Sequence, residues 1–184
     1  MKVVFDTNCL YSFHLRDLCL SLAEFEIIEF FWSAHIKQEL ADSLLTNNKV
    51  SSQQVNGLIQ IISSAFPDAE IRNYENLIGK LNCRDVDDEH VLAAAIAAQA
   101  DFLVTFNTKD FPRDSLKIFG VEIISPDDFL VNLVNLYQNK ILKISTATFS
   151  KYQSPALNLG NYAQILKNAG CPKFAAILNN LLEI

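Results

Sequence analysis

The sequence has few cysteines, glycines and prolines and no long apolar run, and each shortage excludes a class of protein. Five glycines and five prolines among 184 residues argue against a long disordered segment. The four cysteines form no Cys-x-x-Cys pair and have no histidine at zinc-binding spacing, so we expect reduced thiols inside a cell. No signal-like segment precedes the first apolar stretch. Apolar runs end well before the roughly 18 residues that a membrane span needs, which predicts a cytoplasmic protein that makes no membrane contact.

Positive charge is also scarce. The chain has 15 Lys and Arg against 21 Asp and Glu, a formal charge of −6 and a pI near 5.0. This balance argues against a protein that coats nucleic acid through bulk electrostatics. A metal-dependent enzyme is less constrained, because Mg²⁺ or Mn²⁺ held by carboxylates reverses the local charge where a phosphate approaches. The acidity therefore still permits a phosphodiester substrate.

The apolar half of the sequence is distributed as short strands that alternate with amphipathic helices. A chain of 184 residues suffices for one domain with a core plus a small appended piece. The first strand is predicted to end at Asp6. Further strands are predicted over 26–33, 70–75, 101–107 and 121–125, and helices over 8–22, 34–45 and 51–65 and after Asp88. This order predicts an α/β fold, with a parallel sheet flanked by helices.

From Asp127 onward the pattern becomes helical. An apolar face is predicted over 127–138, a polar stretch follows over 145–153, and Pro155 opens a new unit. Two further helices are predicted over 160–168 and 173–182, separated by a Gly-Cys-Pro break. We therefore predict two parts, an α/β domain over 1–126 and a small α-helical C-terminal extension over 127–184.

Two acidic residues stand where structure would expose them to a ligand. Asp6 ends a strand of core-like residues, at the kind of sheet edge where ligands gather. A charge there must pair, bind a metal or reach solvent, although a turn involving Asn8 would also explain it. Asp88 directly precedes the alanine-rich helix together with Asp85 and Asp87, and such acids also serve as helix caps.

Other polar residues are weaker candidates when each is taken alone. Glu39 borders the apolar stripe of the helix over 34–45, but helical glutamates are mostly solvated. Asn107 and Asp110 follow a strand as Asp6 does, and turns also favour both residue types. The hydroxyl and amide groups that could orient Asp6 or a ligating carboxylate belong to Thr7, Asn8 and Thr105. Turn or strand propensity would explain these three residues as well.

Three motifs occur in an order that carries a family resemblance. They are VVFDTN at the start, IKQEL around Glu39, and DVDDEHVLAAAIAAQADFLVTFNTKDFP in the middle. Over roughly residues 1–126 the sequence resembles PIN-domain ribonucleases. The C-terminal piece, with GCPKFAAILNNLL, is similar to the extension in one branch of VapC-like toxins. The resemblance implies a metal-dependent endoribonuclease that uses Mg²⁺ or Mn²⁺ to hydrolyse RNA, usually the toxin of a type II toxin–antitoxin pair. It further implies a cognate antitoxin protein that blocks the site and a possible homodimer.

The resemblance also assigns roles to individual residues. The family's acids fall on Asp6, Glu39 and Asp88. Many relatives have a further Asp at the strand end where this sequence has Asn107, so we assign the fourth catalytic position to Asp110 and keep Asn107 as a neutral contributor. The expected metal ligands are Asp6, Asp88 and Asp110. The residues expected to support them are Thr7, Asn8, Thr105 and Asn107.

Alternative functions stay open at the level of sequence. One is a catalytically silent PIN-like protein that acts as a partner-binding module, in which case Asn107 would mark decay of the site. Another is a non-toxin nuclease of RNA processing. A nucleotide-binding switch is disfavoured because no glycine-rich loop follows the first strand. His35 and His90 are interpreted as ordinary polar helix residues. Three cations beside the acids could contact RNA phosphates or form surface ion pairs, namely Arg84, Lys109 and Arg113.

Overall fold

Five short apolar strands pair in parallel to form one sheet, with the order β3-β2-β1-β4-β5. The strands are β1 (Lys2–Phe5), β2 (Glu29–Ser33), β3 (Glu70–Ile71), β4 (Phe102–Val104) and β5 (Glu122–Ile124). β1 lies in the middle, where Val3 is in register with Phe30 on one side and with Phe102 on the other. The predicted α/β class with a parallel sheet is confirmed, although the strands are shorter than predicted.

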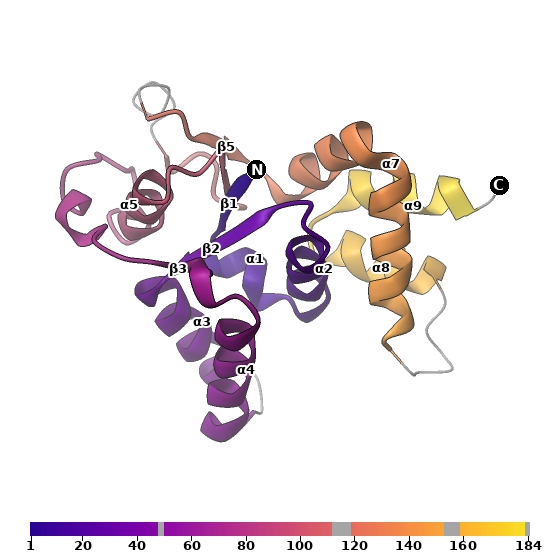
Figure 1. Cartoon of the computed structure of the whole chain (residues 1–184), viewed down its shortest axis with the longest axis horizontal. Coiled ribbons are helices and arrows are strands. Elements are labelled where there is room, and N and C mark those ends of the chain that lie inside the picture. Colours follow the sequence, from indigo (N-terminus) through magenta and orange to yellow (C-terminus); the bar gives the residue numbers. More distant parts are fainter. Residues whose placement is uncertain (48–49, 112–118, 153–158, 183–184) are drawn as a thin grey trace. The chain divides into compact units, whose positions relative to one another are not determined.

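The computed structural model describes residues 1–47, 50–111, 119–152 and 159–182 (Figure 1). Packing divides the chain into two units. The sheet unit comprises Met1–Tyr11 and Ile28–Ile124, and the helical unit comprises Ser12–Ile27 and Ser125–Ile184. The segment Ser12–Ile27 thus belongs to the same unit as the C-terminal helices, whereas the sequence prediction divided the chain into two consecutive parts. The boundaries at 1–126 and 127–184 stay a prediction.

Two helices of the sheet unit, α3 (Ala34–Asn47) and α4 (Ser52–Ala65), begin at serine caps. The unit also contains α1 (Thr7–Tyr11), α5 (Glu89–Ala97) and the 3₁₀ turns η1 (Pro67–Ala69) and η2 (Glu75–Leu77). Ser33 caps α3 by accepting a hydrogen bond from the Ile36 amide at 3.2 Å. Ser51 and Gln54 form a reciprocal capping box on α4. Serine is a preferred residue at a helix N-cap, so both helices begin where the sequence favours it.

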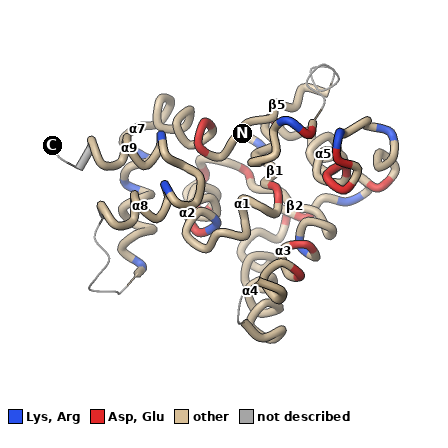
Figure 2. Tube along the Cα trace, turned by 180° about the vertical axis from the view of Figure 1, so that it is seen from behind, with Lys and Arg blue, Asp and Glu red and all other residues tan. Residues whose placement is uncertain are grey.

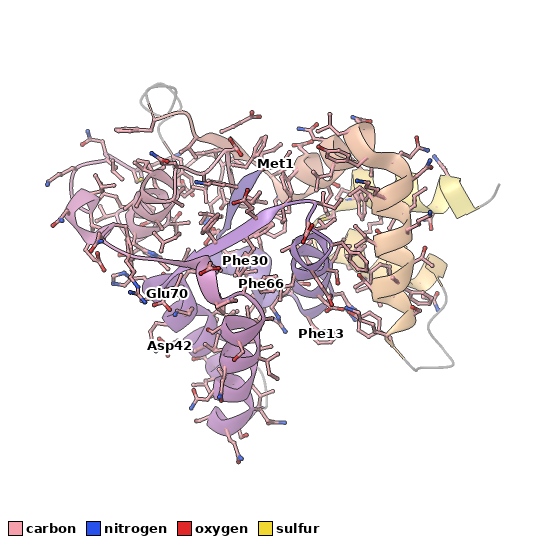
Figure 3. The ribbon with its side chains drawn as sticks, in the orientation of Figure 1. Met1, Phe13, Phe30, Asp42, Phe66 and Glu70 are labelled. Carbon is pink, nitrogen blue, oxygen red and sulfur yellow. The ribbon has the colours of Figure 1, made fainter. Side chains whose placement is uncertain are left out.

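The core of the sheet unit is built from a fully buried central strand and from aromatic residues on β2. Val3, Val4 and Phe5 are inaccessible to solvent, as expected for a parallel strand covered on both faces. The Phe30 ring packs 5.6 Å from that of Phe66, where α4 ends (Figure 3). Three consecutive alanines of α5, Ala93 to Ala95, are also fully buried, and this part of the helix therefore approaches its neighbours closely.

In the described part of the chain, the helical unit contains α2 (Phe13–Glu24), α7 (Pro126–Ser150), α8 (Leu159–Asn168) and α9 (Pro172–Leu182). The buried Asp127 carboxylate accepts hydrogen bonds from the amides of Lys173 and Phe174, at 3.0 and 2.9 Å, and so caps α9. Gly170 has a φ of 94° and ends α8 in the left-handed conformation that favours glycine. No described helix has the length and apolar character that would let it cross a membrane.

Three sequence predictions about the helices need correction or fall outside the described residues. The helix predicted over 8–22 is interrupted at Ser12, whose extended backbone (φ −67°, ψ 119°) separates α1 from α2; serine competes with helical hydrogen bonding in this way. The polar stretch from residue 145 remains helical up to Ser150, while non-helical angles occur instead at Tyr137. Pro155, predicted to open a new unit, lies outside the described residues.

Candidate active site

The first acid, Asp6, lies at the carboxyl edge of the sheet between β1 and β4. Its amide donates to the Val104 carbonyl at 3.0 Å, which continues the pairing of the two strands by one residue. The Thr105 hydroxyl donates to Asp6 Oδ2 at 2.7 Å, and the Asn8 amide lies 3.4 Å from the same oxygen. Asp6 is only 2% exposed. Two of the predicted supporting residues therefore hold the carboxylate in one orientation.

The burial of Asp6 makes its negative charge unfavourable. Burial raises the pKa of Asp6 above 3.8, the Thr105 hydrogen bond opposes the rise, and the charge of Glu39 adds to it. No ion pair within 4 Å involves this carboxylate among the residues that the structure describes. A buried carboxylate without a cationic partner is costly, and a bound cation would relieve that cost.

The second acid, Asp88, occupies the N-cap position of α5, but its side chain makes no capping hydrogen bond. Its Oδ2 instead lies 3.5 Å from Asn107 Nδ2, a long contact that comes from the end of β4. The pKa of Asp88 is raised to about 6, first by burial and then by the charges of Asp6, Asp85 and Asp110, while the hydrogen bond with Asn107 opposes the rise. Helix capping therefore does not account for this carboxylate.

The third acid, Glu39, is held at both of its oxygens. Thr7 Oγ1 donates to Oε2 at 2.7 Å, and His90 Nε2 lies 2.9 Å from Oε1. Burial alone would raise the pKa of Glu39, but the bonds from His90 and Thr7, with the neighbouring His35, bring it below its ordinary value. Glu39 therefore remains ionised under conditions where Asp6 and Asp88 tend to hold protons.

The acids converge on one pocket of about 310 Å³ in the sheet unit. Acidic residues mark α3 and the start of α5 (Figure 2). The pocket is lined by Asp6, Thr7, Asn8, Glu39, Asp42, Ser43 and Asp88. Two other predicted residues, Thr105 and Asn107, hydrogen-bond to acids that line it. The structure thus brings together nine side chains from residues far apart in sequence.

Asp110 is a predicted catalytic residue that does not line the pocket. Its charge nevertheless contributes to the raised pKa of Asp88. Its amide donates to the Asn107 carbonyl at 2.9 Å, and its own carbonyl accepts from the Arg84 amide at 2.7 Å. A turn therefore fixes its backbone near the site. Its assignment as the fourth acid stays a prediction.

Three residues of the site were missed by the sequence reasoning. Asp42 and Ser43 lie three and four positions after Glu39, so they share its helix face, and this spacing could have identified them. Figure 3 shows Asp42 among the side chains of α3. His90 was interpreted as an ordinary polar residue, but it contacts Glu39 across 51 positions of sequence. No local pattern indicates such a contact.

The donor set fits a hard divalent cation. Every acidic side chain that lines the pocket offers carboxylate oxygens, the ligands that Mg²⁺ and Mn²⁺ prefer. The pKa values of Asp6 and Asp88 are both raised, which indicates that a positive charge beside these two carboxylates would be favourable. Within the described residues, no three His, Cys, Asp or Glu side chains stand in metal-binding geometry. The fit therefore depends on the chemistry of the donors.

Comparison with known families identifies the family of this fold. The family model described as PIN domain matches residues 2–109, which is more than half of the chain and includes Asp6, Glu39 and Asp88. The chain belongs to the PIN domain family. This confirms the resemblance inferred from the motifs. The PIN domain is followed by a match of residues 126–180 to a second model, described as VapC50 C-terminal domain.

A relative of this chain is named "Putative ribonuclease VapC50" and comes from Mycobacterium tuberculosis. The two are 34% identical over 103 residues, which is 56% of this chain and 60% of the relative. The match thus spans less than two thirds of the relative's length. No solved structure matches the chain.

Proposed function

We propose that this PIN domain protein is a divalent-metal-dependent endoribonuclease, the toxin of a type II toxin–antitoxin pair. The observation that carries the proposal is the single pocket in which Asp6, Glu39 and Asp88 converge from three different elements. The name of the mycobacterial relative supports RNA as the substrate and the toxin family as the context. The match to the VapC50 C-terminal domain model supports the same branch.

The proposal divides the work among the carboxylates. Asp6 and Asp88 would hold Mg²⁺ or Mn²⁺, with Asp110 as the further ligand that the family resemblance implies. The bound cation supplies positive charge against the scissile phosphate and lowers the pKa of a water molecule. Glu39 is the acid whose pKa lies below its ordinary value, so it is ionised at neutral pH and able to accept the proton of an attacking water. No covalent enzyme intermediate is required.

Three partners belong to the proposal. RNA is the substrate, a cognate antitoxin protein blocks the pocket, and a second copy of the chain forms a homodimer. The proposed place of action is the cytoplasm, where both RNA and antitoxin are found. Each follows from the VapC-like branch and is tested by co-purification of the chain with the product of the neighbouring reading frame, and by its mass in solution.

The decisive experiment measures cleavage of RNA by the purified chain with and without Mg²⁺ or Mn²⁺. We expect cleavage that a chelator abolishes and that Asp6→Asn and Asp88→Asn each reduce by at least about a hundredfold, which is about 2.7 kcal/mol of transition-state stabilisation. Asp87→Asn is the matched control, because Asp87 is an exposed acid beside Asp88 that does not line the pocket. Undiminished cleavage by the Asp6 and Asp88 variants would show that the reaction occurs elsewhere.

The rival reading is a catalytically silent protein that binds a partner. The observation that favours it is Asn107, which stands at the end of β4 where many relatives have an acid. Its side-chain amide faces Asp88 at 3.5 Å, so the position still serves the pocket without a charge. Calorimetry separates the readings, since binding of Mn²⁺ that disappears in Asp6→Asn supports the nuclease. Absence of binding at millimolar metal supports the silent protein. A nuclease of RNA processing would cut RNA without any antitoxin partner.

A further inference from the structure

His90 lies two residues after Asp88, on the first turn of α5, and contacts a different acid. Its Nε2 is 2.9 Å from Glu39 Oε1 on α3, and its side chain is 11% exposed, whereas that of Glu39 is 43% exposed. Its Nδ1 is buried and has no hydrogen-bond partner in the described part of the chain. The imidazole therefore directs its one hydrogen bond at Glu39, and Nε2 carries the proton because a carboxylate only accepts.

The ring of His90 is held in place from its other side. The His35 ring packs with its centroid 5.3 Å from that of His90. His35 Nδ1 in turn lies 2.7 Å from the hydroxyl of Tyr74, which is 1% exposed. A buried tyrosine thus fixes one histidine, and that histidine packs on the next. The donor that reaches Glu39 is supported by residues from outside α5.

Glu39 needs this support because it is a long and partly exposed side chain. An unrestrained glutamate loses rotamer entropy when it is fixed in one conformation. Thr7 Oγ1 on α1 holds Oε2 at 2.7 Å, and His90 holds Oε1. Each carboxylate oxygen of Glu39 therefore has one fixed donor, and the two donors together fix the orientation of the carboxylate plane. Without His90, the carboxylate could rotate about its bond to Thr7.

We propose that His90 is a positioning residue that holds the Glu39 carboxylate toward the pocket through Nε2. This inference rests on the proposed nuclease function, in which Glu39 accepts a proton from the attacking water. It adds a residue that does not line the pocket itself. Support groups of this kind change affinity or activity by about 10–100-fold when removed.

The first test compares two replacements of His90. His90→Leu removes the donor and should lower kcat for RNA cleavage by about 10–100-fold while KM stays unchanged. His90→Gln places an amide N–H near the original Nε2 and should recover most of that loss. Equal losses in the Leu and Gln variants would overturn the proposal. Asp87→Asn is the control, because Asp87 is an exposed acid just before α5 that does not line the pocket.

A double-mutant cycle tests whether His90 acts through Glu39. In a Glu39→Gln background, His90→Leu should have no further effect on kcat, because the proton acceptor that it positions is already lost. Independent effects that multiply would mean that His90 acts by another route, and the proposal would then be wrong. Denaturation midpoints of all variants show whether the fold has been retained.

Nuclear magnetic resonance separates this inference from the proposed function. In the wild-type chain we expect an Nε2–H proton of His90 that is protected from solvent exchange and is lost in Glu39→Ala. If the wild-type chain fails to cleave RNA while this proton is present, the nuclease proposal fails and the His90–Glu39 contact stands. If the proton exchanges freely in the wild-type chain, His90 does not position Glu39.

Discussion

Replacing Thr105 by valine removes the hydroxyl that connects the two strand ends of the site. Thr105 is fully buried; its Oγ1 donates to Asp6 Oδ2 at 2.7 Å and accepts from the Asn107 amide at 3.0 Å. Valine has nearly the same shape, so the change leaves a buried acceptor unsatisfied without opening a cavity. Such a loss costs about 1–3 kcal/mol, and more when the acceptor is charged. We therefore expect Thr105→Val to reduce the free energy of unfolding by about 2–3 kcal/mol at pH 8.

The pH dependence of this cost identifies its origin. The Thr105 bond lowers the pKa of Asp6 against the effect of burial, so its removal raises that pKa further. A group with a raised pKa in the folded state binds more protons folded than unfolded, and stability then falls as pH rises through the folded pKa. The Thr105→Val deficit should therefore be largest when Asp6 is ionised and should shrink as the pH falls toward 4.

Urea denaturation between pH 4 and pH 8, in the absence of divalent metal, measures both effects. Thr105→Ser is the matched control, because it keeps the hydroxyl and loses only a methyl group, which costs about 1 kcal/mol at every pH. A Thr105→Val deficit that equals the Thr105→Ser deficit, or that does not change with pH, would refute the assigned hydrogen bond to Asp6.

Two further predictions concern the metal and the helical unit. Because the folded pKa of Asp88 is raised from 3.8 to about 6, the metal-free chain should lose stability as the pH rises from about 4 to about 6; scanning calorimetry should show Mn²⁺ restoring it above pH 6, with the pH-dependent loss smaller in Asp88→Asn. Asp127→Ala removes the acceptor of two amides at the start of α9 and should lower stability by about 1–2 kcal/mol; urea denaturation checks this, and an unchanged midpoint would contradict the capping role.

The sequence predicted those parts of the fold that depend on local pattern. The short apolar run before Asp6, rich in β-branched residues, indicated a buried strand, and the serines before α3 and α4 are residue types that favour helix starts. The predicted end of this strand also gave the position of Asp6 directly after β1. What local pattern could not predict was the grouping of Ser12–Ile27 with the C-terminal helices, because a helix carries no information about which distant apolar face it will cover.

The candidate site divides along the same line. Asp6 was indicated by its place in a strand, whereas Glu39 on an amphipathic helix was visible only through the family resemblance. His90 was missed because its partner is 51 residues away and the contact depends on how α3 and α5 pack. Asn107 was expected to be a neutral contributor, and its amide faces Asp88. Residues that act through a tertiary hydrogen bond therefore need the structure.

The electrostatics of the three acids provide the argument for their different roles. Burial raises the pKa of Asp6 and that of Asp88, and the charge of Asp6 raises the pKa of Asp88 further. Glu39, with donors on both oxygens, moves the other way. Environments that shift the pKa values of neighbouring acids in opposite directions separate the groups that hold a cation from the group that remains a base. Exchanging the donors of Glu39 for apolar groups should erase that separation, because burial alone would then raise its pKa as well.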